Sequence, residues 1–214
     1  MLYLFDYILF DLDGTIVDTK VGIINGIKYA INKLKLPELN EATMESLIGP
    51  PLKKSFMKVF GVDSEKGDEI VLAYREYYMS TGIEECSLYP GIAELLVKLH
   101  KMNKKILLAT SKPSIMANHI LTYFDLYKYF HFVAGSELDG SRVVKSEVIR
   151  YAIDNADCDD AEKCLMIGDR IYDIEGAKNF GIKTIAVKWG FGSKNEFADA
   201  DWIVDTKEEI LNIV

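Results

Sequence analysis

Two carboxylates stand two residues apart at the end of a short apolar run. Asp11 and Asp13 follow residues 7–10, a run typical of a buried strand, and Gly14 comes next. Glycine can take the positive φ of a sharp turn. Crowded acids repel each other, so they require a cation or a shared proton. The same residues also fit a polar turn with no catalytic or binding role, because Asp and Gly are ordinary turn residues.

The chain after residue 88 alternates between helical and extended patterns. Apolar runs typical of buried strands lie at 105–109, 130–134, 164–167, 184–187 and 202–204. Amphipathic stretches separate most of these runs, and a last one follows them. This alternation predicts an α/β fold, in which a parallel sheet has helices on both faces.

The segment between residues 15 and 87 has a different pattern. Its apolar residues recur at helical spacing, with breaks near Pro37, Gly49-Pro50-Pro51 and Gly61, and no strand is evident. We expect a first helix over about 18–36 with Asp18 as its N-cap. We therefore predict an α/β core of residues 1–16 and 89–214, and an inserted all-helical domain of residues 17–88.

Further polar side chains follow other expected strands. Thr110 and Ser111 come after one strand, Asp169 and Asp173 after another, and Lys145 lies in a loop before a helix. Because the carboxyl ends of parallel strands meet at one edge of a sheet, we expect these side chains to approach Asp11 and Asp13.

Each of these side chains has a simpler explanation when taken alone. The hydroxyls and the two later acids could cap the next helices, and the lysine could be one of many solvated lysines. Their convergence favours chemistry instead. Acids with a hard cation such as Mg²⁺ form a stable set, and hydroxyls with a lysine form an anion site. Together they predict a place for a phosphoryl group.

These motifs resemble those of the haloacid dehalogenase-like (HAD) phosphohydrolase superfamily. The four motifs match in order, and the resemblance covers essentially the whole chain; they are residues 11–15, 110–111, 145 and 168–173. It implies a Rossmann-like core with an inserted helical (C1-type) cap. Residues 49–52 and 190–193 are similar to the phosphoglycolate phosphatase-like and 5'-nucleotidase-like branch.

The resemblance also implies roles for the polar residues. Asp11 is the expected nucleophile, which forms an aspartyl-phosphate, and Asp13 is the expected general acid and base. Thr110, Ser111 and Lys145 are expected to hold the phosphoryl oxygens.

A Mg²⁺ ion is the expected cofactor. The resemblance implies that the carboxylates of Asp11 and Asp169 and the backbone carbonyl of Asp13 bind it. Asp173 is expected either to support the metal site or to hold Lys145; the sequence leaves both open.

Substrate choice is expected to depend on the cap, because the core recognises only phosphate. Lys20, Lys53 and Lys54 are candidates for contacts with an acidic substrate, although solvated lysines would look the same.

The expected function is Mg²⁺-dependent hydrolysis of small-metabolite phosphate monoesters, of the phosphoglycolate or nucleoside 5'-monophosphate class. Alternatives are a β-phosphoglucomutase-type phosphomutase, a pyrophosphatase and a non-catalytic binding protein. Gly14-Thr15 fits phosphatases better, since those mutases commonly carry Gly-Val there.

Composition narrows the choice of partners. The net charge of −8 argues against a nucleic-acid surface. Cys86, Cys158 and Cys164 are odd in number and form no C-x-x-C pair, so we expect thiols in a reducing cytoplasm rather than a disulfide framework or a zinc site.

The first residues and the overall hydropathy predict no membrane association. Residues 1–6 are apolar but lack the basic start of a signal peptide, and we interpret them as a first strand. No apolar run reaches the ~18 residues of a membrane span. We expect a cytoplasmic monomer or homodimer that acts on a small-molecule phosphate ester.

Overall fold

The computed structural model describes residues 5–214, and the chain divides into two compact units. The first, here the α/β unit, consists of Met1–Val17 and Leu88–Val214, and the second, the helical unit, of Asp18–Ser87. Residues 1–4 of the strand expected at the start lie outside the described residues, and the first described strand begins at Tyr7. Within the described residues, no helix is long and apolar enough to cross a membrane.

The α/β unit is built on a six-stranded sheet in the order β5-β4-β1-β6-β7-β8, and all neighbouring pairs are parallel. Its strands are β1 (Tyr7–Phe10), β4 (Lys105–Pro113), β5 (Phe130–Ser136), β6 (Cys164–Gly168), β7 (Lys183–Val187) and β8 (Trp202–Val204). The prediction of a parallel α/β sheet is confirmed. β1 lies between β4 and β6, with Leu9 aligned with both Leu107 and Met166.

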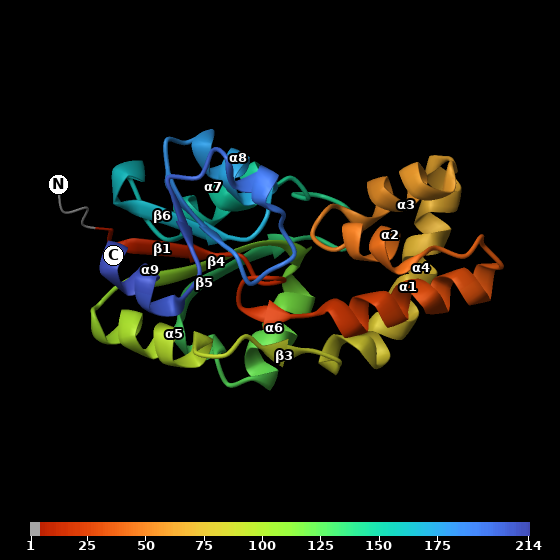
Figure 1. Cartoon of the computed structure of the whole chain (residues 1–214), viewed down its shortest axis with the longest axis horizontal. Helices are drawn as coiled ribbons and strands as arrows, with labels where there is room; N and C mark the ends of the chain where they lie inside the picture. Colours follow the sequence, from red (N-terminus) through yellow and green to blue (C-terminus); the bar gives the residue numbers. More distant parts are fainter. Residues whose placement is uncertain (1–4) are drawn as a thin grey trace. The chain divides into compact units, whose positions relative to one another are not determined.

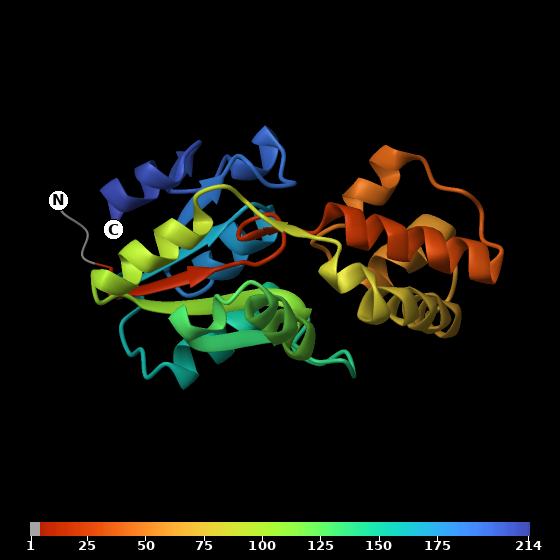
Figure 2. The same ribbon diagram turned by 90° about the horizontal axis from the view of Figure 1, so that it is seen from below.

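Helices cover both faces of this sheet (Figure 1). α7 (Lys145–Asn155) and α8 (Ile171–Lys178) pack together on one face. α5 (Ile92–Lys101) and α9 (Lys207–Ile213) pack together on the other, as Figure 2 also shows. α6 (Ser114–Tyr123) packs against β4 and β5. From β5 the chain passes through α7 to β6, which lies beyond β4 and β1 in the sheet. Because crossovers between parallel strands are right-handed, a crossover in this direction places α7 on the face opposite to α5.

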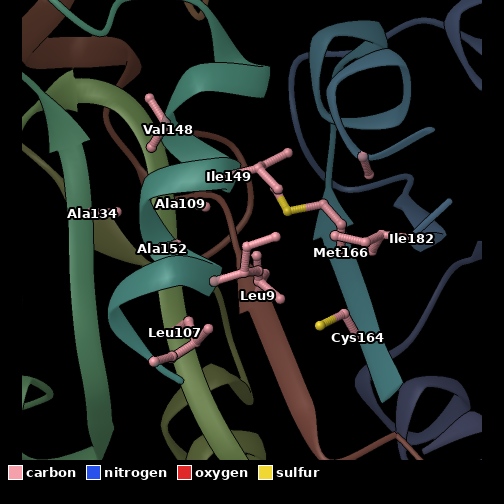
Figure 3. Packing of buried hydrophobic residues seen from close by; sticks show 13 residues of the cluster. Leu9, Leu107, Ala109, Ala134, Val148, Ile149, Ala152, Cys164, Met166 and Ile182 are labelled. Carbon is pink, nitrogen blue, oxygen red and sulfur yellow. The ribbon is translucent and has the colours of Figure 1, made fainter. Parts of the chain in front are cut away.

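Apolar side chains fix α7 on the sheet. Figure 3 shows a buried cluster in which side chains of α7 meet apolar side chains of the sheet; its members include Leu9, Leu107, Ala109, Met166, Val148, Ile149 and Ala152. Burial of each large apolar side chain contributes about 1.5–3 kcal/mol. Because Lys145 is the first residue of α7, this packing also fixes the place of its backbone.

The helical unit contains α1 (Lys20–Leu34), α2 (Glu41–Ser46), α3 (Leu52–Phe60) and α4 (Ser64–Ser80). α4 packs against both α1 and α3. α1 begins later than expected, because the Asp18 carboxylate accepts the N–H of Lys20 at 3.0 Å rather than capping a helix as its N-cap residue.

Two short strands stand where the chain crosses between the units. β2 (Val17–Asp18) pairs with β3 (Ser87–Leu88). The expectation that residues 15–87 contain no strand is therefore wrong at these crossings. Two residues are too few to show the alternation by which a strand is recognised in a sequence.

Candidate active site

Three neighbouring strands bring the candidate residues to one edge of the sheet. Asp11 directly follows β1 and Asp169 directly follows β6, whereas Thr110 and Ser111 lie within β4, which is longer than expected. Lys145 is the first residue of α7 and not a loop residue. The packing of α7 therefore places Lys145 at the same edge.

Three buried acids form the centre of the site. One carboxylate oxygen each from Asp11, Asp169 and Asp173 lies within 4.8 Å of the others. The Nζ of Lys145 lies 2.8 Å from Asp11 Oδ1 and 2.8 Å from Asp173 Oδ1, and it donates to the carbonyl of Ala109 at 3.0 Å. Lys145 therefore joins Asp11 to Asp173.

Burial makes the charges of this cluster costly. Burial, followed by the charges of Asp173 and Asp11, raises the pKa of Asp169 well above its ordinary value. Burial also raises the pKa of Asp173 to about 6, although Lys145 opposes the shift. Burial lowers the pKa of Lys145, but Asp11 and Asp173 together raise it above its ordinary value.

The donor set fits a divalent cation. Three carboxylates and one ammonium leave two uncompensated negative charges. Carboxylate oxygens are hard ligands of the kind that Mg²⁺ prefers. Without a cation, protons have to supply the missing charge, which agrees with the raised pKa of Asp169 and Asp173.

A glycine-rich loop encloses Asp169. The N–H of Phe191 donates to its Oδ2 at 2.7 Å, and Thr15 Oγ1 donates to its Oδ1 at 3.2 Å. A Cβ on Gly190 would lie 2.4 Å from Asp169 Oδ2, and one on Gly192 would lie 1.8 Å from the Asp169 carbonyl oxygen. In the sequence, residues 190–193 are notable only for a family resemblance, whereas in the structure the backbone of this loop packs directly against Asp169.

The turn after β1 also approaches Asp169 so closely that it requires a glycine. Gly14 has φ +83°, and a Cβ there would lie 2.2 Å from Asp169 Oδ2. Trp189 Nε1 donates to the carbonyl of Thr15 at 3.1 Å, so this turn and the loop after β7 are tied together. Neither the approach of Gly14 to Asp169 nor the bond between Trp189 and Thr15 can be inferred from residue spacing, because each joins segments far apart in the chain.

The polar residues at the strand ends do not all cap the helices that follow them. α6 has Pro113 at its N-cap and no side-chain capping bond, so neither Thr110 nor Ser111 caps it. Thr110 Oγ1 instead accepts the N–H of Lys112 at 3.2 Å. Asp173 does cap α8, since its Oδ2 accepts the N–H of Arg170 at 3.0 Å while its Oδ1 faces Lys145.

Lys112 is a further residue of the site, and none of the sequence motifs includes it. Its side chain is buried, and its Nζ lies 2.9 Å from Oδ2 of Asp13. Its position directly after Thr110 and Ser111, at the end of an expected strand, is the one signal in the sequence that could have revealed it.

Two of the three candidate lysines of the helical unit have acidic neighbours in that unit. Lys20 forms ion pairs with Glu45 and, at 3.9 Å, with Glu41. Lys53 lies 2.7 Å from Asp68, and Lys54 is exposed on α3. A contact between these lysines and a substrate stays a prediction.

Comparisons with known proteins agree with this geometry. Residues 8–187 match the model of the haloacid dehalogenase-like hydrolase family. The chain is 42% identical over 189 residues to a 5'-nucleotidase of Pseudomonas aeruginosa, which covers 88% of this chain and 85% of that protein. It is also 34% identical over 192 residues to a protein of Mycobacterium tuberculosis named tyrosine-protein kinase PtkA, which covers 90% of this chain and 65% of that protein.

A solved structure is similar over nearly the whole chain. It is described as a predicted phosphatase from Clostridium acetobutylicum, with a TM-score of 0.92 and 38% identity, and the match covers 98% of this chain and 99% of that one.

Mg²⁺ is expected to stabilise the protein more at about pH 7.5 than at about pH 5. The pKa of Asp169 is raised and that of Asp173 is about 6, whereas an unfolded Asp titrates near ~3.9. Between about pH 5 and pH 7.5 the folded metal-free chain binds more protons than the unfolded chain, so its free energy of unfolding falls as the pH rises. Protons and Mg²⁺ compete for the same carboxylate oxygens, so Mg²⁺ binds and stabilises more at the higher pH.

The measurement is the shift of Tm on addition of saturating Mg²⁺ at each pH. Asp154→Asn, an exposed acid on α7, serves as the control that should leave the shift unchanged. Equal shifts at both pH values would contradict the assignment of this cluster as a cation site.

Gly190→Ala is expected to abolish the Mg²⁺-dependent shift of Tm, because the added Cβ would displace the Asp169 carboxylate. The matched control is Ser193→Ala in the same loop, where the hydroxyl donates to Glu196 Oε1 at 3.3 Å. An unchanged shift in Gly190→Ala would show that the loop does not have to approach Asp169 so closely.

Proposed function

Because this chain belongs to the haloacid dehalogenase-like hydrolase family and is a phosphatase, we propose that it hydrolyses phosphate monoesters of small metabolites through an aspartyl-phosphate at Asp11. The observation that carries the proposal is the position of Asp11, which is buried beside Lys145 and within reach of Asp169 and Asp173. A carboxylate in such a place can attack a phosphoryl group whose charge is balanced nearby.

The reaction proceeds in two steps. A carboxylate oxygen of Asp11 forms a bond to phosphorus, the bond to the ester oxygen breaks, and Asp13 gives its proton to the departing alkoxide. Asp13 then takes a proton from a water molecule that attacks the aspartyl-phosphate. Inorganic phosphate leaves, and Asp11 and Asp13 return to their starting states.

The neighbouring groups hold the phosphoryl oxygens. Lys145 brings a positive charge next to Asp11 and reduces the repulsion between this carboxylate and an anionic ester. The Thr110 and Ser111 hydroxyls are the proposed further donors at the end of β4. These groups keep the attacked atom in line between Asp11 and the leaving oxygen.

Mg²⁺ is the proposed cofactor. The carboxylates of Asp11 and Asp169 and the backbone carbonyl of Asp13 would hold it, with Asp173 in support through Lys145. When bound, the ion supplies positive charge that neutralises the phosphoryl oxygens.

The proposed substrates are nucleoside 5'-monophosphates or phosphoglycolate. The relative named 5'-nucleotidase supports the first class. We propose that the helical unit is the cap that selects the leaving group, since the core residues bind only phosphate. Release of phosphate from a metabolite panel tests both classes, and the same panel tests pyrophosphate and the isomerisation of a sugar phosphate.

Transfer of a phosphoryl group from ATP to tyrosine is an alternative reaction that a separate assay can test. The relative named tyrosine-protein kinase makes this a specific alternative. Incubation of the protein with ATP and a tyrosine peptide should produce no phosphopeptide, while phosphate monoesters lose their phosphate. The reverse result would replace the proposed reaction.

Asp11→Asn is expected to reduce phosphate release by at least about 10³-fold, because an amide cannot form the covalent intermediate. The fold should survive, and circular dichroism and Tm check this. Asp6→Asn, an acid before β1, is the control that keeps activity. Substantial turnover by Asp11→Asn would remove this residue from the role of nucleophile.

Removal of divalent metal by EDTA is expected to stop phosphate release, and added Mg²⁺ should restore it, since two negative charges of the site would otherwise face an anionic substrate. Calcium, which tolerates looser coordination, should restore less activity. Full activity in EDTA would exclude a metal-dependent reaction.

A further inference from the structure

Each acid of the turn after β1 is paired with a lysine. Lys145 faces Asp11, and Lys112 faces Asp13 with 2.9 Å between Nζ and Oδ2. The side chains of Lys112 and Asp13 are only 5% and 13% exposed. A buried ion pair rarely gains much stability over an apolar pair, so its presence beside a reacting carboxylate calls for another explanation.

The two oxygens of Asp13 have different surroundings. Oδ2 contacts Lys112, whereas Oδ1 is buried without a hydrogen-bond partner in the part of the chain that the structure describes. The terminal torsion of a carboxylate is soft, so an isolated Asp13 would rotate and exchange its oxygens. The contact with Lys112 fixes one oxygen and leaves the other available.

The backbone around Lys112 is held on both sides. Its N–H donates to Thr110 Oγ1 at 3.2 Å, and Ser136 Oγ on β5 donates to the carbonyl of Ser111 at 2.7 Å. A Cβ on Gly135 would lie 2.5 Å from the Lys112 carbonyl oxygen, so β5 approaches it very closely. The pairing of β4 and β5 also shifts register between Ala109 and Pro113. Such irregularities redirect side chains at the end of a strand.

We propose that Lys112 is a positioning residue for the reaction. It anchors Oδ2 of Asp13, so that Oδ1 meets the leaving oxygen in the first step and water in the second. This proposal rests on the proposed phosphatase function. General acid–base catalysis contributes about 10²–10⁴-fold to such reactions and depends on the placement of the donor.

The test compares two esters with different leaving groups. For an alkyl phosphate, whose alkoxide needs a proton, Lys112→Met is expected to lower kcat/KM by about 10–100-fold. For p-nitrophenyl phosphate, whose phenolate leaves without one, the loss should be several-fold smaller. Lys112→Arg keeps the charge and should recover part of the lost activity on the alkyl ester. Lys105→Met, at the other end of β4, is the control that leaves both values unchanged.

A double-mutant cycle shows whether Lys112 acts through Asp13. In the Asp13→Asn background, Lys112→Met should cost nothing further on the alkyl ester. An equal loss on both esters, or a full additional loss in the Asp13→Asn background, would overturn the proposal and indicate that Lys112 contacts substrate directly.

The outcomes of the two proposals remain separate. If the wild-type protein released no phosphate from either ester, the phosphatase function itself would fail. If the wild type is active but Lys112→Met matches it on the alkyl ester, only the positioning role fails. Should Lys112→Met lower Tm strongly, Lys112→Gln, which keeps a polar group, carries the same comparison.

Discussion

The constraint on which this site depends is the burial of three carboxylates at one place. Asp11, Asp169 and Asp173 converge at the carboxyl ends of two adjacent strands, and Lys145 balances only part of their charge. In a medium of low dielectric constant such an excess is costly unless a cation or protons compensate it. The same excess makes the site suited to a dication and, through it, to a phosphoryl group.

The fold satisfies this constraint with rigid elements. β1 lies in the middle of the sheet and is directly followed by Asp11. Its neighbour β4 contains Lys112, and its other neighbour β6 is directly followed by Asp169. α7 is fixed by apolar packing and presents Lys145 from its first residue. Groups on such elements lose little freedom when they act together, which is what electrostatic catalysis requires.

Close backbone approach is the second physical demand. Asp169 is surrounded so tightly that Gly14, Gly190 and Gly192 have no room for a Cβ. The loop after β7 therefore belongs to the site, although its own side chains supply none of the acids. The charges of the helical unit differ from those of the site, because its lysines Lys20 and Lys53 are paired with acids of the same unit.

The sequence by itself determined the α/β class, the helical insertion as an expectation, and the types of residue at the strand ends. It could do so because periodicity is local, and because parallel strands bring their carboxyl ends to one edge. It also predicted that Lys145 would approach Asp11 and Asp13 at that edge, but it left open whether Asp173 holds Lys145.

Only the tertiary structure decided which partner each of these residues has. Asp173 lies against Lys145, Lys112 lies against Asp13, and Gly190 lies against Asp169. Each of these contacts joins residues that are at least 20 positions apart in the chain. Their distances follow from the order and register of the strands and from the packing of α7, and no local pattern in the sequence records these.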